Sequence, residues 1–319
     1  YDKAGRIISE TDANKHTTRY RYGKTGLVSE ITDALGQKAL FEYDALGNVT
    51  KITAPGNAVT QYAYDISGRL TTQTDATGLV TEYGYDENSQ LISVVTNGNE
   101  SLYEYDAMGN VSSVTDAEGR CIKLTYDLNG NLTEIIYPDG TKDVTEYDAL
   151  GRVVQSTPRT GLATAYAYDE SGNIVRMTQG EQTTAYEYDL LGRMVRQIAA
   201  DGTETVYAYD ALGNLVGQTD ELGNQTTFSY TAESLLEQVT YANGASQSLS
   251  YDLAGNITGE TDAEGNAKQY QYDKANRLIA VVDELGGKTS YAYDAMDHIV
   301  QVTDALRHAT KYTYDKDGN

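Results

Sequence analysis

The heptapeptide Tyr43-Asp44-Ala45-Leu46-Gly47-Asn48-Val49 recurs almost unchanged as Tyr209-Asp210-Ala211-Leu212-Gly213-Asn214-Leu215. Tyrosines mark its place at sixteen points between Tyr1 and Tyr314, and thirteen of the fifteen intervals are 21 residues while two are 20. Asp follows this tyrosine in 14 of the 16 places, and Gly stands three residues after the Asp position in 12. A fixed period of this length is typical of stacked supersecondary units. The sequence therefore predicts a single array of about fifteen units over residues 1–319.

The residues of this signature have the chemistry of a tight turn. Asp at the first turn position accepts backbone N–H groups, and Gly at the fourth tolerates a positive φ. The position two residues after the glycine is apolar in all fifteen complete units, as at Val49 and Leu215. The structural signature residues of the best-matching units are Tyr43, Asp44, Gly47, Tyr64, Asp65, Gly68, Tyr105, Asp106, Gly109, Tyr147, Asp148, Gly151, Tyr209, Asp210, Gly213, Tyr251, Asp252 and Gly255.

Each unit carries a second turn signal, which reads Thr-Asp-x-x-Gly in units such as residues 32–36 and 219–223, and Tyr-Pro-Asp-Gly or Tyr-Ala-Asn-Gly at residues 137–140 and 241–244. The segment before the next Tyr-Asp alternates, as in Thr60, Tyr62 and Tyr64, which indicates a strand with one aromatic face. One unit is therefore strand, turn, strand, turn, and the chain is predicted to be all-β with about 30 antiparallel strands and almost no helix. Because strand pairs twist and wide open sheets are rare, we expect this sheet to curl.

Composition excludes several functions. The 319 residues include 47 acidic and 24 basic side chains, so the net charge of −23 argues against nucleic-acid binding and against anionic membrane surfaces. No apolar run is long enough for a membrane-spanning helix, so no membrane insertion is expected. The single cysteine, Cys121, is interpreted as a half-buried strand residue rather than a metal ligand or nucleophile.

We predict no catalytic, cofactor-binding or metal site, and no enzyme activity. Calcium needs six or more converging oxygens, whereas the repeat supplies one Asp per turn, so a turn cap is the better interpretation. His16, His298 and His308 are the only histidines, and their spacing does not suit zinc; turn or surface positions are expected.

Two features leave alternatives open. The tyrosine stripe is expected to pack the sheet, and the alternative is a sugar-binding platform. Some units lack the turn glycine and carry Ser89, Ser234, Asn276 or Asp297 in its place. Asn and Asp tolerate positive φ, so sequence drift explains these departures better than a site.

The sequence resembles the Rhs/YD-repeat family, which comprises the rearrangement-hotspot proteins and similar repeats in toxin-complex shells and teneurins. The match rests on units such as residues 43–49 and 209–215 and extends in register over essentially the whole chain. The resemblance implies a long β-sheet that spirals into a hollow shell. In bacterial members that shell encloses a C-terminal toxin, and the protein is secreted or displayed at the cell surface.

The family's self-cleaving Asp-Pro-x-Gly motif does not occur in this sequence. We therefore expect the chain to be a length of wall from a larger protein. The predicted function is a structural shell segment of an Rhs-type polymorphic toxin or surface protein, with the C-terminal effector as its partner. The alternative is a cell-surface adhesin or carbohydrate-binding module, with a cell-surface glycan as its partner. No cofactor and no nucleic acid are expected.

Overall fold

The computed structural model describes residues 1–314. These residues contain thirty β-strands and a three-residue 3-10 turn, η1 (Pro55–Asn57). The prediction of an all-β fold with about 30 strands is confirmed. None of the helical segments in residues 1–314 has the length and apolar character needed to cross a membrane.

The strands follow one another at the spacing of the repeat. In chain order they are β1 (Ser9–Thr11), β2 (Thr17–Tyr22), β3 (Val28–Thr32), β4 (Lys38–Tyr43), β5 (Val49–Thr53), β6 (Val59–Tyr64), β7 (Leu70–Thr74), β8 (Val80–Tyr85), β9 (Leu91–Thr96), β10 (Asn99–Tyr105), β11 (Val111–Thr115), β12 (Cys121–Tyr126), β13 (Leu132–Ile136), β14 (Lys142–Tyr147), β15 (Val153–Thr157), β16 (Thr164–Tyr168), β17 (Ile174–Gln179), β18 (Gln182–Tyr188), β19 (Met194–Ile198), β20 (Glu204–Tyr209), β21 (Leu215–Thr219), β22 (Gln225–Tyr230), β23 (Leu236–Thr240), β24 (Ser246–Tyr251), β25 (Ile257–Thr261), β26 (Ala267–Tyr272), β27 (Leu278–Val282), β28 (Lys288–Tyr293), β29 (Ile299–Thr303) and β30 (Ala309–Lys311).

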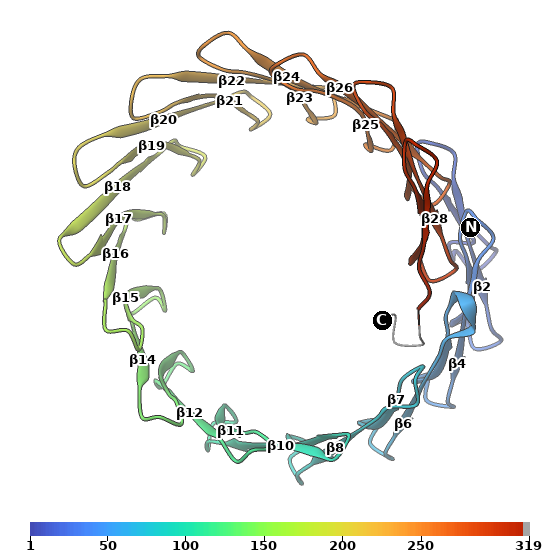
Figure 1. Ribbon diagram of the computed structural model, residues 1–319. Helices are drawn as coiled ribbons and strands as arrows, with labels where there is room; N and C mark the ends of the chain where they lie inside the picture. The colour runs from blue at the N-terminus through green and yellow to red at the C-terminus, as the bar shows by residue number, and fades with distance from the viewer. Residues whose placement is uncertain (315–319) are drawn as a thin grey trace. The chain divides into compact units, whose positions relative to one another are not determined.

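The chain forms two compact units. Unit 1 comprises residues 1–82, 231–239 and 245–319, and unit 2 comprises residues 83–230 and 240–244. The hairpins of unit 2 follow one another along a curved strip (Figure 1). Unit 1 contains two strips of hairpins. Residues 1–82 form its N-terminal strip, and residues 231–239 and 245–314 form its C-terminal strip. The first strands of the chain lie beside the last ones (Figure 1).

A recurrent β-bulge bends the hairpins next to their Tyr-Asp turns. In the β4–β5 pair, Glu42 lies opposite Lys51 but Tyr43 lies opposite Val49, so Thr50 is the extra residue. The same shift recurs at Tyr22, Tyr64, Tyr147, Tyr209 and Tyr293, among others. Bulges bend the strand and increase its twist. These bulges explain why the sheet curls. The prediction of a curled antiparallel sheet of tandem hairpins is confirmed.

The backbone ladder between successive hairpins is shorter than the ladder within them. The β3–β4 ladder ends at the pair Glu30 and Leu40, so these strands are unpaired toward the Tyr-Asp turns. Tyr43 fills this space, and its hydroxyl donates a hydrogen bond to the Val28 carbonyl at 2.8 Å. Equivalent bonds run from Tyr22 to Ile7, Tyr64 to Val49, Tyr105 to Leu91, Tyr147 to Leu132, Tyr168 to Val153, Tyr188 to Ile174, Tyr209 to Met194, Tyr230 to Leu215, Tyr251 to Leu236, Tyr272 to Ile257, Tyr293 to Leu278 and Tyr314 to Ile299.

The two 20-residue intervals have a local explanation at the second turn. Thr96 pairs with Asn99, so only Asn97 and Gly98 connect β9 to β10, and both have positive φ. A two-residue turn of this kind suits the twist of a hairpin. The β17–β18 hairpin is shortened in the same way at residues 180–181. The second turn is therefore the one that is shorter in these two units, and the Tyr-Asp turn is unchanged.

The sheet has almost no fully buried side chains. Among the described residues, the buried apolar side chain is Ala280 and the buried polar one is Ser113. The accessible surface of 20154 Å² compares with about 13,000 Å² for a compact protein of this mass. Tyrosines and aliphatic residues share one face, as where Phe41 pairs with Ile52 and Tyr291 with Val302. The fold is therefore a single-layer sheet with half-buried faces.

The substitution Gly213→Val tests the turn conformation. Gly213 has a φ of 94°, and a Cβ there would meet no atom within 4 Å, so the penalty lies in the backbone. We expect a loss of roughly 1–2 kcal/mol, confined first to β20 and β21 because tandem units couple mainly to their neighbours. Hydrogen exchange measures this loss. Gly213→Asn is the control, since Asn276 holds the equivalent place at a φ of 60°; uniform opening of all units in the valine variant would contradict the expectation.

The substitution Tyr209→Phe tests the bond between hairpins. It removes the 2.9 Å hydrogen bond to the Met194 carbonyl and keeps the ring, so we expect a loss of about 1 kcal/mol in urea unfolding. Tyr126→Phe is the matched control, because the described residues contain no hydrogen bond from the Tyr126 hydroxyl. Equal losses in the two variants would show that the hydroxyl bond does not stabilise the sheet.

Candidate functional site

The Asp of each turn organises the backbone around it. Asp210 Oδ1 accepts hydrogen bonds from the backbone N–H groups of Leu212 and Asn214, and Oδ2 accepts one from the Asn214 amide at 2.9 Å. The Gly213 N–H donates to the Asp210 carbonyl. The Asn214 side-chain bond, together with these backbone N–H groups, lowers the pKa of Asp210 and outweighs the opposing desolvation. The carboxylate is thus fully used by its own turn.

The structure places all eighteen signature residues at the Tyr-Asp turns. Each tyrosine ends a strand and each Asp opens the turn. The signature glycines Gly47, Gly68, Gly109, Gly151, Gly213 and Gly255 have φ values between 78° and 94°. Ser89, Ser234, Asn276 and Asp297 also take positive φ where the glycine is lost. These residues recur one turn per hairpin and do not converge on one centre.

Arginine after the turn glycine links neighbouring hairpins. Arg193 Nε donates to Asp189 Oδ2 at 2.7 Å, and its Nη1 donates to the Asp210 carbonyl of the next turn at 3.1 Å. The Arg193 guanidinium lies 4.8 Å from the ring centroid of Tyr209, which is a cation–π distance. Equivalent stacking joins Arg6 to Tyr22, Arg152 to Tyr168 and Arg277 to Tyr293.

His298 occupies this position of a Tyr-Asp turn, and His16 and His308 occupy the corresponding position of Thr-Asp turns. Each ring Nδ1 faces Oδ2 of the turn Asp, at 3.2 Å for His16 with Asp12 and 3.0 Å for His308 with Asp304. His298 faces Asp294 at 3.1 Å and stacks on Tyr314 with a centroid distance of 4.7 Å. The histidines therefore replace the Asn or Arg of other repeats.

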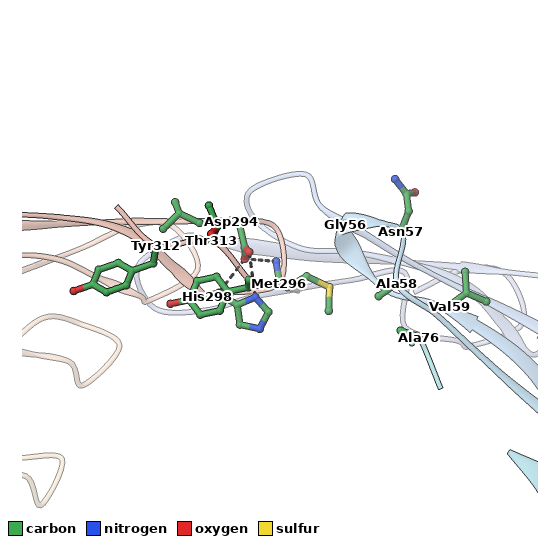
Figure 2. A pocket seen from close by; sticks show the side chains of 12 residues that line it. Gly56, Asn57, Ala58, Val59, Ala76, Asp294, Met296, His298, Tyr312 and Thr313 are labelled. Atoms are coloured by element: carbon green, nitrogen blue, oxygen red, sulfur yellow. Dashed lines mark hydrogen bonds and ion pairs between the residues drawn. The ribbon is translucent and has the colours of Figure 1, made fainter. Parts of the chain in front are cut away.

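A groove of about 810 Å³ lies in unit 1 between the two strips (Figure 2). Gly56, Val59 and Ala76 line it from the N-terminal strip, and Met296, His298 and Tyr312 are among the C-terminal lining residues. Asp294 Oδ1 accepts the backbone N–H groups of Met296 and His298, so the polar pair in the groove serves its own turn. The lining combines aliphatic, aromatic and turn residues, with Thr313 among them.

Residues 1–314 contain no group of three or more His, Cys, Asp or Glu side chains that could hold a metal ion. Cys121 is half-buried at the start of β12, and its thiol faces the Ile122 carbonyl at 3.8 Å. The tyrosine stripe is largely half-buried, and the exposed tyrosines of the described chain are Tyr1, Tyr241 and Tyr312. A hydrogen bond to Glu260 raises the pKa of Tyr270 to about 12.

The comparison with protein families decides the identity. The RHS Repeat family matches residues 1–39, 43–80, 67–101, 85–120, 105–142, 147–184, 209–246, 234–267, 251–288 and 272–309. The chain belongs to the RHS repeat family. No protein of curated function matches this RHS repeat chain.

Solved structures share the RHS repeat fold. The crystal structure of TcdB2-TccC3 without its hypervariable C-terminal region is 16% identical, with a TM-score of 0.82 over 99% of this chain and 20% of the other. TcdB2-TccC3-Cdc42 is 18% identical, with a TM-score of 0.76 over 96% and 19%. TcdB2-TccC3-TEV is 15% identical, with a TM-score of 0.74 over 96% and 21%. The chain spans about a fifth of these proteins' length, and at this identity the likeness shows the fold alone.

Asp210→Asn tests the charged turn cap in the RHS repeat. Because the folded pKa of Asp210 is lowered, its charge stabilises the fold above the ordinary Asp pKa, and this contribution is lost as the pH falls through the folded value. We expect the variant to melt about 2–4 °C below the wild type at pH 7, with a smaller difference at pH 3. Thermal denaturation at both pH values measures it, and a difference that grows at pH 3 would contradict this role.

Proposed function

We propose that this RHS repeat chain is a length of wall in a hollow shell that encloses the C-terminal effector of a longer secreted or cell-surface protein. The observation that carries the proposal is the single-layer sheet, in which the recurrent Tyr, Asp and Gly residues serve the turns and the links between hairpins. A wall needs this arrangement and needs no reaction centre. The resemblance to Rhs-type shells supports this role, and the fold shared with TcdB2-TccC3 is compatible with it.

The chemistry of the turns supports a role without catalysis. The Asp carboxylates are bonded to their own backbone, as at Asp44 and Asp210, and so lack the free, convergent geometry of a paired acid and base. The net charge of −23 favours a basic enclosed chain over an acidic one. We therefore propose a non-enzymatic, encapsulating role for this segment, with secretion or surface display inferred from the family.

Protease protection tests the proposal on the product of the complete gene. We expect the region after these repeats to resist added protease in the intact protein. The triple variant Gly109→Val/Gly151→Val/Gly213→Val strains three turns and should speed cleavage of that region by about tenfold or more. The matched variant with Asn at the same three glycines should keep the protection. Equal cleavage in all three proteins would refute encapsulation.

The alternative is a surface adhesin or carbohydrate-binding module. It requires accessible aromatic faces, and the half-buried tyrosines give it less support than the wall. A glycan array probed with residues 1–319 distinguishes the two. Saturable binding that Tyr207→Ala and Tyr166→Ala abolish would favour the adhesin.

A further inference from the structure

One turn of the Tyr-Asp series has glycine where the others have aspartate. Gly23 stands in this place, and its N–H donates to the Leu27 carbonyl at 2.8 Å, while the Gly26 N–H donates to the Gly23 carbonyl at 3.0 Å. The corresponding bonds of the Asp44 turn are 2.9 and 3.2 Å, and φ is 86° at Gly26 and 92° at Gly47. The turn at residues 23–27 therefore has the shape of the other turns without their carboxylate.

This replacement leaves two backbone donors exposed to an incoming acceptor. In the Asp44 turn, Oδ1 accepts the backbone N–H groups of Leu46 and Asn48, both at 2.9 Å. The equivalent donors of the Gly23 turn are the N–H groups of Thr25 and Leu27. No acceptor within residues 1–314 bonds to either of them.

The other exception in the series has kept an acceptor. Thr231 replaces the aspartate there, and its Oγ1 accepts the N–H groups of Glu233 and Leu235 at 3.2 and 3.3 Å. Loss of the aspartate alone therefore does not open a turn. The Gly23 turn differs because its first residue has no side chain.

The place of the absent side chain has room for a carboxylate. A Cβ on Gly23 would meet no atom closer than 3.8 Å, and Thr25 Oγ1 would lie 3.9 Å from it. In another turn of the protein, the hydroxyl of Thr77, which holds the same turn position as Thr25, donates to Asp75 Oδ1 at 2.6 Å. Thr25 thus offers a third donor to an anion at this place. Gly23 and Thr25 are both exposed, so the place is open to solvent.

Basic side chains surround this turn. Lys24 lies within it and is exposed. The Arg6 guanidinium lies 4.4 Å from the ring centroid of Tyr22, and its Nη1 would be 3.4 Å from a Cβ on Gly26. Asp2 accepts the Arg6 Nε at 2.7 Å, and Nη1 is directed to the Gly23 turn instead.

The local charge is opposite in sign to that of the whole protein. Residues 1–27 contain six basic and three acidic side chains, whereas the complete chain has a net charge of −23. The end of the sheet that holds the Gly23 turn therefore attracts anions that the rest of the surface repels.

We propose that the turn at residues 23–27 is a binding site for a carboxylate group of an acidic peptide. Successive backbone N–H groups in such a turn form a concave anion site, and bonds from them to a carboxylate are charge-assisted. The protein itself shows the fit, because a carboxylate accepts the same donors in the Asp44 turn. Lys3 holds the place of Lys24 one repeat earlier, about 10 Å away across two strands, so it can attract a second carboxylate of the same peptide. This site does not depend on an enclosed effector.

NMR titration of ¹⁵N-labelled protein tests the site. The probes are the peptide acetyl-Gly-Glu-Gly-Glu-Gly-amide, its analogue with Gln in place of Glu, and sodium acetate. We expect saturable shifts of the Thr25 and Leu27 amide signals, with the acidic peptide bound about tenfold more tightly than acetate and no saturation by the Gln analogue. Lys24→Gln should weaken peptide binding about threefold or more, and high salt should reduce this difference.

Two substitutions at one residue separate the carboxylate site from a structural effect. Gly23→Asp supplies a carboxylate to the same N–H groups, so it should abolish binding of the peptide. Gly23→Ala is the matched control, because it adds a Cβ where there is room and adds no acceptor. It should change the affinity less than about twofold. Equal binding by the Gly23→Asp protein, or equal loss in both variants, overturns the proposal.

A second turn provides a control within the wild-type chain. Ala54 replaces aspartate there, and no side chain within residues 1–314 accepts the N–H groups of Gly56 and Ala58. Residues 54–58 include no Lys or Arg, so their amide signals should not saturate over the range that saturates Thr25 and Leu27. Equal affinity at the two turns overturns the role of the basic side chains. Acetate that binds as tightly as the peptide overturns the peptide as the ligand and assigns the site to a free carboxylate ion.

Discussion

The hydrogen bond that recurs from the Tyr-Asp tyrosines to carbonyls of the preceding hairpins holds this sheet together where its backbone ladder stops. Tyr43 reaches Val28 and Tyr209 reaches Met194 by the same geometry. A single-layer sheet has little buried core to stabilise it, so local bonds repeated at every unit replace the packing of a globular domain. The tyrosine ring fills the space between diverging hairpins and its hydroxyl satisfies a carbonyl that would otherwise be unpaired. Phenylalanine supplies only the ring, which explains why tyrosine holds this position of the repeat.

Much of this fold is readable from the sequence because its determinants are local. Asp and Gly at fixed positions specify the turns, and the period-2 alternation of Thr60, Tyr62 and Tyr64 specifies a strand and its face. Asn97-Gly98 is also a strong hairpin signal by itself, and the structure has a two-residue turn there. The bulge opposite each Tyr-Asp turn follows from register and has no signal of its own in a single unit.

Other features depend on contacts between units and could not be derived from one repeat. The variation between Asn and Arg after the turn glycine reads as a neutral exchange, yet Arg193 bonds two successive turns and stacks on Tyr209. The spacing of sixteen residues between Arg and Tyr was the available signal. The pairing of Asn14 with Asp252 spans 238 residues and depends on how far the sheet curls, which the sequence does not state. The sequence gives no reason to expect a catalytic or metal site, because one Asp per turn distributes the carboxylates along the sheet and does not gather them at one place.

The shortened hairpins at residues 96–99 and 179–182 carry a wider consequence. A residue has been deleted from one margin of the sheet, while the tyrosine hydroxyl bonds of Tyr105 and Tyr188 persist with the partner one position nearer in sequence. The length of the turn therefore varies along the edge that carries the second turns, and it is constant along the edge that carries the Tyr-Asp turns. Residues can be added to or removed from the second turns without changing how the hairpins pair. Foreign peptides inserted into these turns would be displayed at regular intervals along an unaltered sheet.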